Sequence, residues 1–339
     1  MSRAQLTSTV EQSNGGVVAP FLAGKNKIIN GDFGIWQRGA SFSNPSSLAY
    51  TADRWAIYYD GSGATRTISQ QAFTTGAAPV SGYESSFFYR YAVSVAGSGN
   101  TANLLRQYIE NVRNFAGQTA TVSFWAKASA NITVPSVGTT QNFGTGGSPS
   151  AGVDTGFATN IAVTTSWQRF SFTANIPSIS GKTLGTNNDT SLELRFFLPA
   201  GSSTFTFDIW GVQVEAGSVA TPFTTASGTL QGELALCQRY YQSRSVMYKS
   251  TSSGGFSTNA YDSGIFPTQM RATPTLVFTS DTGTSGAANL YVSGSATAST
   301  AISITAAVDG FRGNFSNASW GTTANGAFLA YSYTANAEL

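Results

Sequence analysis

Apolar and polar residues alternate along most of the first two thirds of this chain, and this pattern predicts β-strands. Successive side chains of a strand point to opposite faces, so a period of two indicates one buried and one solvated face. Turn-forming residues separate the runs, as in DGSG at residues 60–63 and NND at residues 187–189. Many short strands at this spacing predict an all-β sandwich or jelly roll. The alternating runs cover residues 53–59, 87–95, 120–127, 167–173, 192–198 and 204–215.

The C-terminal part of the chain carries further strand patterns and is richer in Ser, Thr, Ala and Gly. Two segments before it have some helical character. Residues 232–242 contain the good helix formers Leu, Ala and Arg, and they are expected to form a helix that connects two β domains. Residues 101–112 fit either a short helix or a strand followed by a turn. C-terminal strands are expected at residues 275–279, 289–293, 301–305, 310–315 and 327–334.

Together these elements predict an all-β chain of four parts, since 339 residues suit two β domains. Residues 1–26 would form an extended N-terminal arm, which is a frayed tail in a monomer or an anchor in an assembly. The apolar patch at residues 17–22 favours docking on a neighbour. Next come a jelly-roll β-sandwich at 27–225, a helical connector at 226–245 and a C-terminal β-sandwich domain at 246–339.

The composition argues against several classes of function. The chain has no histidine and one cysteine, Cys237, so Ser-His and Cys-His triads and thiolate metal sites are excluded. We therefore do not expect an enzyme. Lys+Arg number 18 against 16 Asp+Glu without a basic run, which argues against nucleic-acid binding. No stretch approaches the ~20 apolar residues of a membrane helix, so no membrane insertion is expected.

Charged residues make up only 10% of the chain, against roughly 25% in an average globular protein. Such a neutral surface suits a protein that assembles or that contacts uncharged ligands such as sugars. It is equally consistent with a β-rich extracellular composition. The N-terminal residues MSRAQL lack the apolar segment of a secretory signal. We therefore expect a protein that is made in a cytosol and either stays there or is released by lysis.

Carboxylates are the first candidates for site chemistry. Glycosidases need two of them, but no pair stands out in the sequence, and most would cap turns. A structural calcium site is the more specific possibility. Asp32 lies near the start of the first domain and Asp208 near its last strand, and these strands can pair in a jelly roll. Calcium prefers several such oxygen ligands. The alternative is that residues 30–32 form a plain turn.

Aromatic side chains are the second group of candidates, because a ring face is a flat, weakly polar platform for a sugar. Tyr59 and Tyr83 lie next to predicted turns and are the candidates for an exposed glycan-binding position. Tyr58, Trp125 and Trp167 could also stack on sugars, although most aromatic residues are expected in the core. The alternation assigns three tryptophans to packing: Trp36, Trp55 and Trp210.

Several sequence blocks together resemble those of tailed-phage virion surface proteins, of the tail-fibre or head-fibre type, that carry a carbohydrate-binding-module-like jelly roll. In chain order the blocks are KIINGDFGIWQRG at 27–39, YTADRW at 50–55, WGVQVEAGSVATPF at 210–223, ELALCQRYY at 233–241, FP at 266–267 with MRATP at 270–274, and ANAEL at 335–339. They follow the order seen in that family and span nearly the whole chain after the arm.

The resemblance implies a jelly-roll sandwich displayed on the surface of a phage particle, synthesis in the host cytoplasm, a homotrimer, and recognition of host-surface glycan. The arm would bind other virion proteins. Related modules place an acidic residue for structural calcium directly after the Phe of the NGDF block, and this position is Gly34 here.

Three functions follow as alternatives. The first is a non-catalytic tail fibre or tail-tip adhesin. The second is a head fibre or capsid decoration protein, which the short chain without fibre repeats also fits. The third is a polysaccharide depolymerase. The absence of histidine and of a β-helix repeat argues against it.

Overall fold

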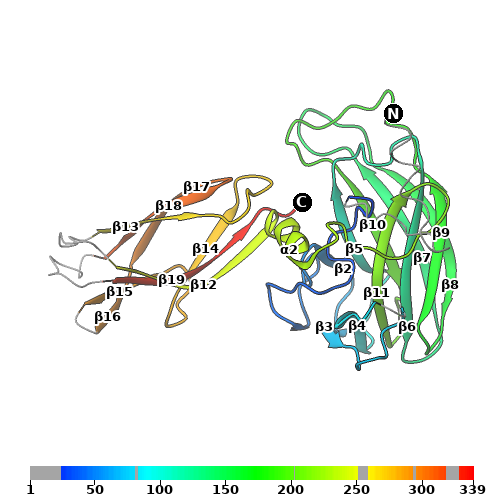
Figure 1. Cartoon of the computed structure of the whole chain (residues 1–339), viewed down its shortest axis with the longest axis horizontal. Helices are drawn as coiled ribbons and strands as arrows, with labels where there is room; N and C mark the ends of the chain where they lie inside the picture. The colour runs from blue at the N-terminus through cyan, green and yellow to red at the C-terminus, as the bar shows by residue number, and fades with distance from the viewer. Residues whose placement is uncertain (1–23, 81–82, 202, 251–258, 293–294, 318–327) are drawn as a thin grey trace, which may run out of the picture.

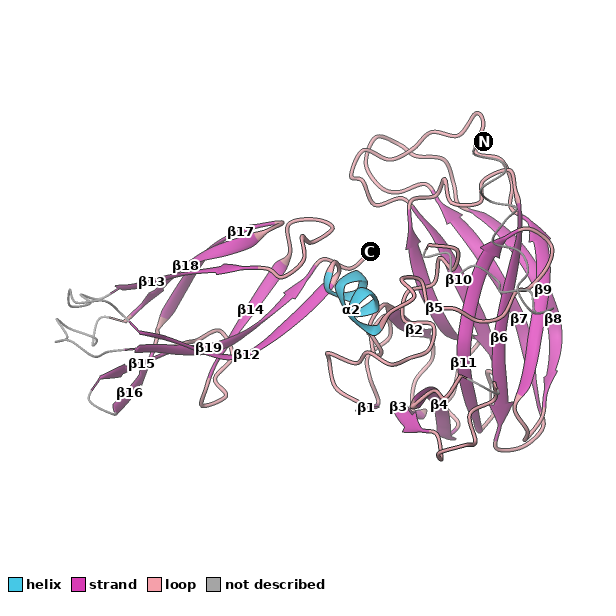
Figure 2. Ribbon diagram, viewed as in Figure 1, coloured by secondary structure: helices cyan, strands magenta, loops and turns pink. Residues whose placement is uncertain are grey.

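A computed structural model describes residues 24–80, 83–201, 203–250, 259–292, 295–317 and 328–339. It confirms the predicted all-β class: strands dominate and one helix, α2, lies between two β units (Figures 1 and 2). The arm expected at residues 1–26 lies mostly outside the described residues. In the described part of the chain, no helix is long and apolar enough to cross a membrane.

The first unit is a jelly-roll sandwich of two antiparallel sheets. The six-stranded sheet has the order β1 (Ser41–Ser43), β3 (Thr65–Ala72), β4 (Phe87–Val95), β11 (Phe205–Ala216), β6 (Thr119–Ala128) and β9 (Gln168–Asn175). The five-stranded sheet has the order β2 (Trp55–Tyr59), β5 (Asn103–Glu110), β10 (Ser191–Leu198), β7 (Ile132–Asn142) and β8 (Val153–Val163). The ambiguous segment at 101–112 is therefore a strand followed by a turn.

Alternate residues of the two sheets meet in one hydrophobic core. Its largest fully buried members include Trp55, Phe124 and Phe196, and the ring centroids of the two phenylalanines lie 5.0 Å apart. Burying a large apolar side chain stabilises a fold by about 1.5–3 kcal/mol. The core therefore fixes which residues of each strand face outward.

Strand β11 contains a bulge whose shape depends on glycine. The pairing of β11 with β6 shifts between Trp210 and Gln213, and Gly211 has a φ of 66°, a left-handed conformation that glycine adopts without strain. Beside it, the Val212 amide donates a hydrogen bond to the carbonyl oxygen of Gly31. A Cβ atom on Gly31 would clash with the Val212 carbonyl oxygen. The absence of a side chain at Gly31 thus lets the segment before β1 lie directly against β11.

Helix α2 (Leu230–Gln238) begins at a clear N-cap. The Thr229 hydroxyl accepts a hydrogen bond from the Gly232 amide, which satisfies one of the free N–H groups of the first turn. The buried carboxylate of Glu233 accepts hydrogen bonds from the amides of Ser227 and Asn30, at 2.6 and 2.8 Å. The helix is thereby fixed to the first unit. It ends earlier than the expected residue 242, because Tyr241 already begins a strand.

The second unit consists of two smaller sheets. One has the order β12 (Tyr241–Ser250), β19 (Phe328–Asn336), β15 (Asn289–Val292) and β16 (Ser295–Ala298), and β14 (Thr275–Ser280) also pairs with β19. The other has the order β13 (Asn259–Ile265), β18 (Gly310–Ser316) and β17 (Ala301–Ala307). Phe278, Phe315 and Tyr331 are central members of a separate core. Strands β14, β15, β17, β18 and β19 occupy the positions expected from the sequence.

Candidate functional site

The buried Arg54, the partly buried Arg38 and one glutamate connect the two β units. Arg54 is 1% exposed and forms an ion pair with Glu338, while one of its guanidinium nitrogens donates to the Tyr108 carbonyl oxygen at 2.6 Å. Arg38 binds the other oxygen of the Glu338 carboxylate at 3.1 Å. One carboxylate from the C-terminal segment therefore forms ion pairs with two cations of the jelly roll.

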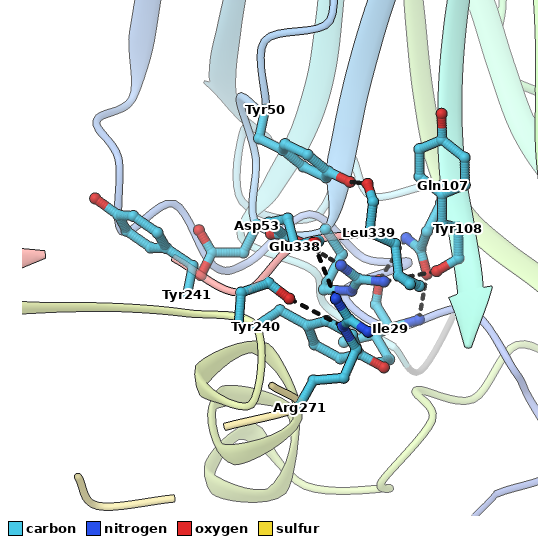
Figure 3. A network of polar contacts seen from close by, with 12 residues as sticks. Ile29, Tyr50, Asp53, Gln107, Tyr108, Tyr240, Tyr241, Arg271, Glu338 and Leu339 are labelled. Carbon is cyan, nitrogen blue, oxygen red and sulfur yellow. Dashed lines mark hydrogen bonds and ion pairs between the residues drawn. The ribbon is translucent and has the colours of Figure 1, made fainter. Parts of the chain in front are cut away.

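Tyrosine rings cover these arginines. The Arg54 guanidinium lies 3.4 Å from the ring centroid of Tyr240, and that of Arg38 lies 3.6 Å from the ring centroid of Tyr241. Such cation–π contacts contribute roughly 2 kcal/mol when they are desolvated. The Tyr50 hydroxyl also donates to the carbonyl oxygen of Leu339 at 3.0 Å (Figure 3).

Arg271 fixes the same C-terminal segment from the second unit. Its guanidinium donates to the carbonyl oxygens of Ala337 and Glu338 at 3.0 and 3.2 Å. Residues 27–39, 50–55, 233–241, 270–274 and 335–339 thus all contribute contacts at or beside this junction. These are five of the blocks that carry the sequence resemblance. What they share in this structure is that they supply contacts between the two β units.

The two carboxylates expected to share a calcium ion have separate surroundings. Asp208 on β11 accepts two hydrogen bonds from Arg90, at 2.7 and 2.8 Å, and lies 3.8 Å from the Lys127 ammonium. Asp32 lies on the segment before β1, and no ion pair or hydrogen bond among the described residues joins it to Asp208. The described part of the chain contains no group of three or more acidic, Cys or His side chains that could hold a metal.

Asp32 lines a pocket of about 420 Å³ together with Tyr83. Burial, and then the neighbouring Glu233 carboxylate, raise the pKa of Asp32 to about 6. The Tyr83 ring packs against Trp210 and Phe223, with centroids 5.5 and 5.7 Å away, and burial raises the pKa of its phenol. Of the two tyrosines proposed for glycan, Tyr83 thus borders a cavity, with only part of its ring available.

Tyr59 is tied down more fully. The Arg66 guanidinium lies 3.8 Å from its ring centroid, and its hydroxyl donates to the Pro45 carbonyl oxygen at 2.9 Å. Its ring also packs against the core. A sugar could not stack on the ring face that Arg66 covers. The next residue back, Tyr58, belongs to the opposite face of the sheet.

The outer face of the five-stranded sheet carries a more extended set of aromatic and charged side chains. Leu105, Ile109, Leu192, Leu194 and Phe196 point into the core, so the residues between them on β5 and β10 point outward. Strand register then defines three outward rows. The first contains Tyr58, Leu104, Phe197, Ser136 and Thr159; the second Ala56, Arg106, Arg195, Gly138 and Gly156; the third Tyr108, Glu193, Thr140 and Asp154.

Ion pairs connect the second and third rows. Arg106 binds Glu193 at 3.1 Å, and Arg195 binds Asp154 at 2.7 Å. The Thr140 hydroxyl donates to the same Asp154 oxygen at 2.7 Å. Aromatic rings flank the arginines: Arg106 lies 5.1 Å from the Tyr108 ring centroid.

Sequence reasoning named Tyr58 as a possible stacking residue but missed the rest of this face. The signal that could have found it is the charged series in β5 and β10, where Arg106, Glu193 and Arg195 interrupt apolar runs at every second position.

Solved structures that are similar to this chain include carbohydrate-binding modules. The sequence matches no protein-family model, and a search of curated proteins finds no match. Among solved structures, a CBM4 module is 18% identical, with 56% of this chain and 98% of that chain covered and a TM-score of 0.33. The CBM22-1 xylan-binding domain of Paenibacillus barcinonensis Xyn10C is 10% identical, with coverage of 53% and 94% and a TM-score of 0.31.

A phage protein is also similar. The enzymatically active domain of tailspike protein 4 from bacteriophage CBA120 is 15% identical, with 52% of this chain but only 21% of that chain covered and a TM-score of 0.31. These TM-scores lie below 0.5, so no function of this chain is inferred from these structures.

Proposed function

We propose that this protein is a non-catalytic phage virion component, displayed on the particle surface, whose jelly roll binds host-surface glycan. It would act as a tail fibre or tail-tip adhesin and would be made in the host cytoplasm. The observation that carries the glycan-binding part is the outer face of the five-stranded sheet. There Tyr58, Tyr108 and Phe197 surround paired charged groups.

Chemistry supports this face as a glycan site. Sugar rings present apolar C–H faces and rims of hydroxyl groups, which aromatic rings and fixed polar groups bind respectively. Tyr58, Tyr108 and Phe197 are all partly exposed, so their rings are available to a ligand. Ala56, Leu104 and Glu193 of the same rows are buried, so the partly exposed rings are the accessible part of this face.

The virion part of the proposal rests on the sequence blocks and on the low content of charged residues. Both suit a protein that assembles with other virion proteins, and the family resemblance favours a homotrimer anchored by the N-terminal arm. A head fibre or capsid decoration protein is the second candidate, because the chain has 339 residues and no fibre repeat. Immunogold labelling of intact particles distinguishes the two: a tail location supports the adhesin, and a capsid location supports the decoration protein.

The absence of catalysis is part of the same proposal. A glycosidase requires one carboxylic acid and one carboxylate at the scissile bond. On the outer face, Glu193 and Asp154 are each held in an ion pair with an arginine, so neither carboxylate is free to act at a scissile bond. Incubation with host polysaccharide should therefore release no reducing ends, and release that Glu193→Gln abolishes would identify a depolymerase instead.

A glycan array with the full chain tests the binding site. We expect binding that Tyr58→Ala and Phe197→Ala each weaken by about tenfold, which corresponds to roughly 1.4 kcal/mol. Tyr261→Ala is the matched control, because this tyrosine is 74% exposed on β13, away from the jelly roll. Equal binding by all three variants would place the glycan site elsewhere, with the pocket at Tyr83 as the next position to test.

A further inference from the structure

A buried cluster of polar side chains holds the loop after β11 against that strand. Gln213 and Glu215 lie two residues apart near the end of β11, so they point to the same side of it, and they are 0% and 1% exposed. The loop returns Thr221 to them. Its hydroxyl donates to Glu215 Oε2 at 2.8 Å and accepts a hydrogen bond from Gln213 Nε2 at 3.1 Å. A hydroxyl, a carboxylate and a carboxamide thus meet at a largely buried position.

The carboxylate of Glu215 is placed to act as a general base on this hydroxyl. Burial raises the pKa of Glu215, but hydrogen bonds, chiefly from Thr221, outweigh burial and lower it, so the carboxylate is ionised at neutral pH. The Lys25 ammonium donates to Thr221 Oγ1 at 2.6 Å and lies 3.1 Å from Glu215 Oε2. A nearby cation stabilises the negative charge that develops on an oxygen as it loses its proton. The adjacent base and this cation together prepare the threonine hydroxyl to act as a nucleophile.

The carboxamide of Gln213 is placed to receive the attack. Its oxygen accepts a hydrogen bond from the backbone amide of Thr224 at 3.0 Å, a donor that would stabilise an oxyanion at this atom. Its nitrogen lies 2.6 Å from Oε1, the other carboxylate oxygen of Glu215. The carbonyl carbon is bonded to this nitrogen at about 1.3 Å, so it lies within about 4.4 Å of Thr221 Oγ1. A shift of about 1 Å brings these two atoms to the ~3–3.5 Å at which attack begins.

We propose that Thr221 and Gln213 react with each other to form an intramolecular ester that fixes the loop covalently to β11. Glu215 takes the proton from Thr221 Oγ1, Oγ1 forms a bond to Gln213 Cδ, and the bond between Cδ and Nε2 breaks. The carboxyl group of Glu215 passes the proton to Nε2, which leaves as ammonia. The reaction needs no cofactor and leaves Glu215 unchanged. Burial of Gln213 shields the ester from water. This cross-link is independent of glycan binding.

Mass spectrometry of the full chain tests the proposal. The loss of one ammonia should lower the mass by about 17 Da from the value that the sequence requires. Digestion of the unfolded protein after glutamate should leave residues 194–215 joined to residues 216–233, because the ester spans the cut after Glu215. Hydroxylamine, which cleaves esters but not amides, should then separate the two pieces.

Three outcomes would overturn the proposal. The first is a chain with the full mass required by its sequence. The second is a pair of pieces that separate before hydroxylamine is added. The third is residues 12–84 attached to residues 194–215 by a bond that resists hydroxylamine, which would mean that the amine of Lys25 had reacted and the hydroxyl of Thr221 had not.

Substitutions test the role of each group. Thr221→Val lacks the nucleophile and Glu215→Gln lacks the base, so both should have the full mass of their sequences. Thr221→Ser keeps a hydroxyl and should keep the loss of ammonia, which distinguishes removal of the nucleophile from damage to the fold. Thr173→Val is the matched control, because this exposed threonine donates to the Ser218 carbonyl oxygen of the same loop at 3.4 Å. It should also keep the loss of ammonia. A cross-link that persists in Thr221→Val would contradict the proposal.

Discussion

Asp32 is a carboxyl group held largely out of water and close to a second carboxylate, that of Glu233. Its pKa is about 6, against an ordinary value of 3.8. The folded protein therefore binds this proton more tightly than the unfolded chain does. The stabilisation from protonated Asp32 is complete below pH 3.8 and is lost as the pH rises through about 6. At neutral pH, Asp32 lowers the stability of the fold.

The substitution Asp32→Asn should remove this penalty. An amide has nearly the shape of the carboxylic acid and its oxygen can still accept a hydrogen bond, so the variant should be more stable at pH 7 by roughly 2–3 kcal/mol. At pH 4 the two proteins should be nearly equal. Urea unfolding of both proteins at about pH 4, 5, 6 and 7 measures the difference in their free energies of unfolding below and above the pKa of Asp32. A constant difference across this range would mean that Asp32 titrates normally.

The tyrosines illustrate what a sequence can and cannot reveal at this scale. Alternation places Tyr58 and Tyr59 on opposite faces of one strand, and the structure agrees. It cannot say which face is covered, because that depends on Arg66 and Pro45, which lie outside β2. In the same way, the partner of Asp208 is Arg90, 118 residues away. Only the strand register brings these two residues together.

At the scale of elements, the contact between Gly31 and β11 fixes the start of the jelly roll. A methyl group at Gly31 would clash with the Val212 carbonyl oxygen, and backbone atoms cannot rotate away. We expect Gly31→Ala to destabilise the fold by about 1–3 kcal/mol, the usual cost of overpacking.

Thermal or urea unfolding measures this effect. Gly156→Ala is the control, because this glycine lies in a strand with free space around a Cβ. It should change the stability by less than about 0.5 kcal/mol. If both alanine variants are equally stable, the approach of residues 27–31 to β11 is looser than described.

The type of each element was predictable wherever a single period of apolar and polar residues dominates the sequence. Period-two alternation was enough for β6, β10 and β11, whose inner faces form the core. Residues 101–112 remained ambiguous, because Leu104, Leu105 and Ile109 fit a helical as well as an alternating pattern. Pairing of β5 with β2 and β10 decides for the strand. The helix ended early for a related reason: Tyr241 pairs with Asn336, which lies 95 positions later in the sequence.

At the scale of the whole molecule, the junction makes one body of two units. Glu338 forms ion pairs with both Arg38 and Arg54. Glu338→Ala would leave the buried Arg54 and the partly buried Arg38 without this partner, and removing one member of a buried ion pair typically costs about 3–5 kcal/mol. Because that loss falls between the units, we expect it to uncouple their unfolding.

Differential scanning calorimetry should detect the uncoupling as two transitions in Glu338→Ala, where the parent protein shows one. Asp309→Ala removes an exposed carboxylate from the second unit and should leave the profile unchanged. A single transition at the parent temperature in Glu338→Ala would show that the packed faces, without the ion pairs, hold the units together.

The junction also gathers both ends of the second unit at one point. The Ala337 amide donates to the Tyr240 carbonyl oxygen at 2.8 Å, where β12 leaves the jelly roll and β19 returns to it. A force that pulls β12 and β19 away from the jelly roll would therefore be shared by two neighbouring strands. Both strands would be pulled in the same direction away from the junction. The force would therefore not shear β12 along β19. The ion pairs of Arg38 and Arg54 with Glu338 would then have to break before β19 could separate from the jelly roll, so we expect both strands to transmit force to the jelly roll.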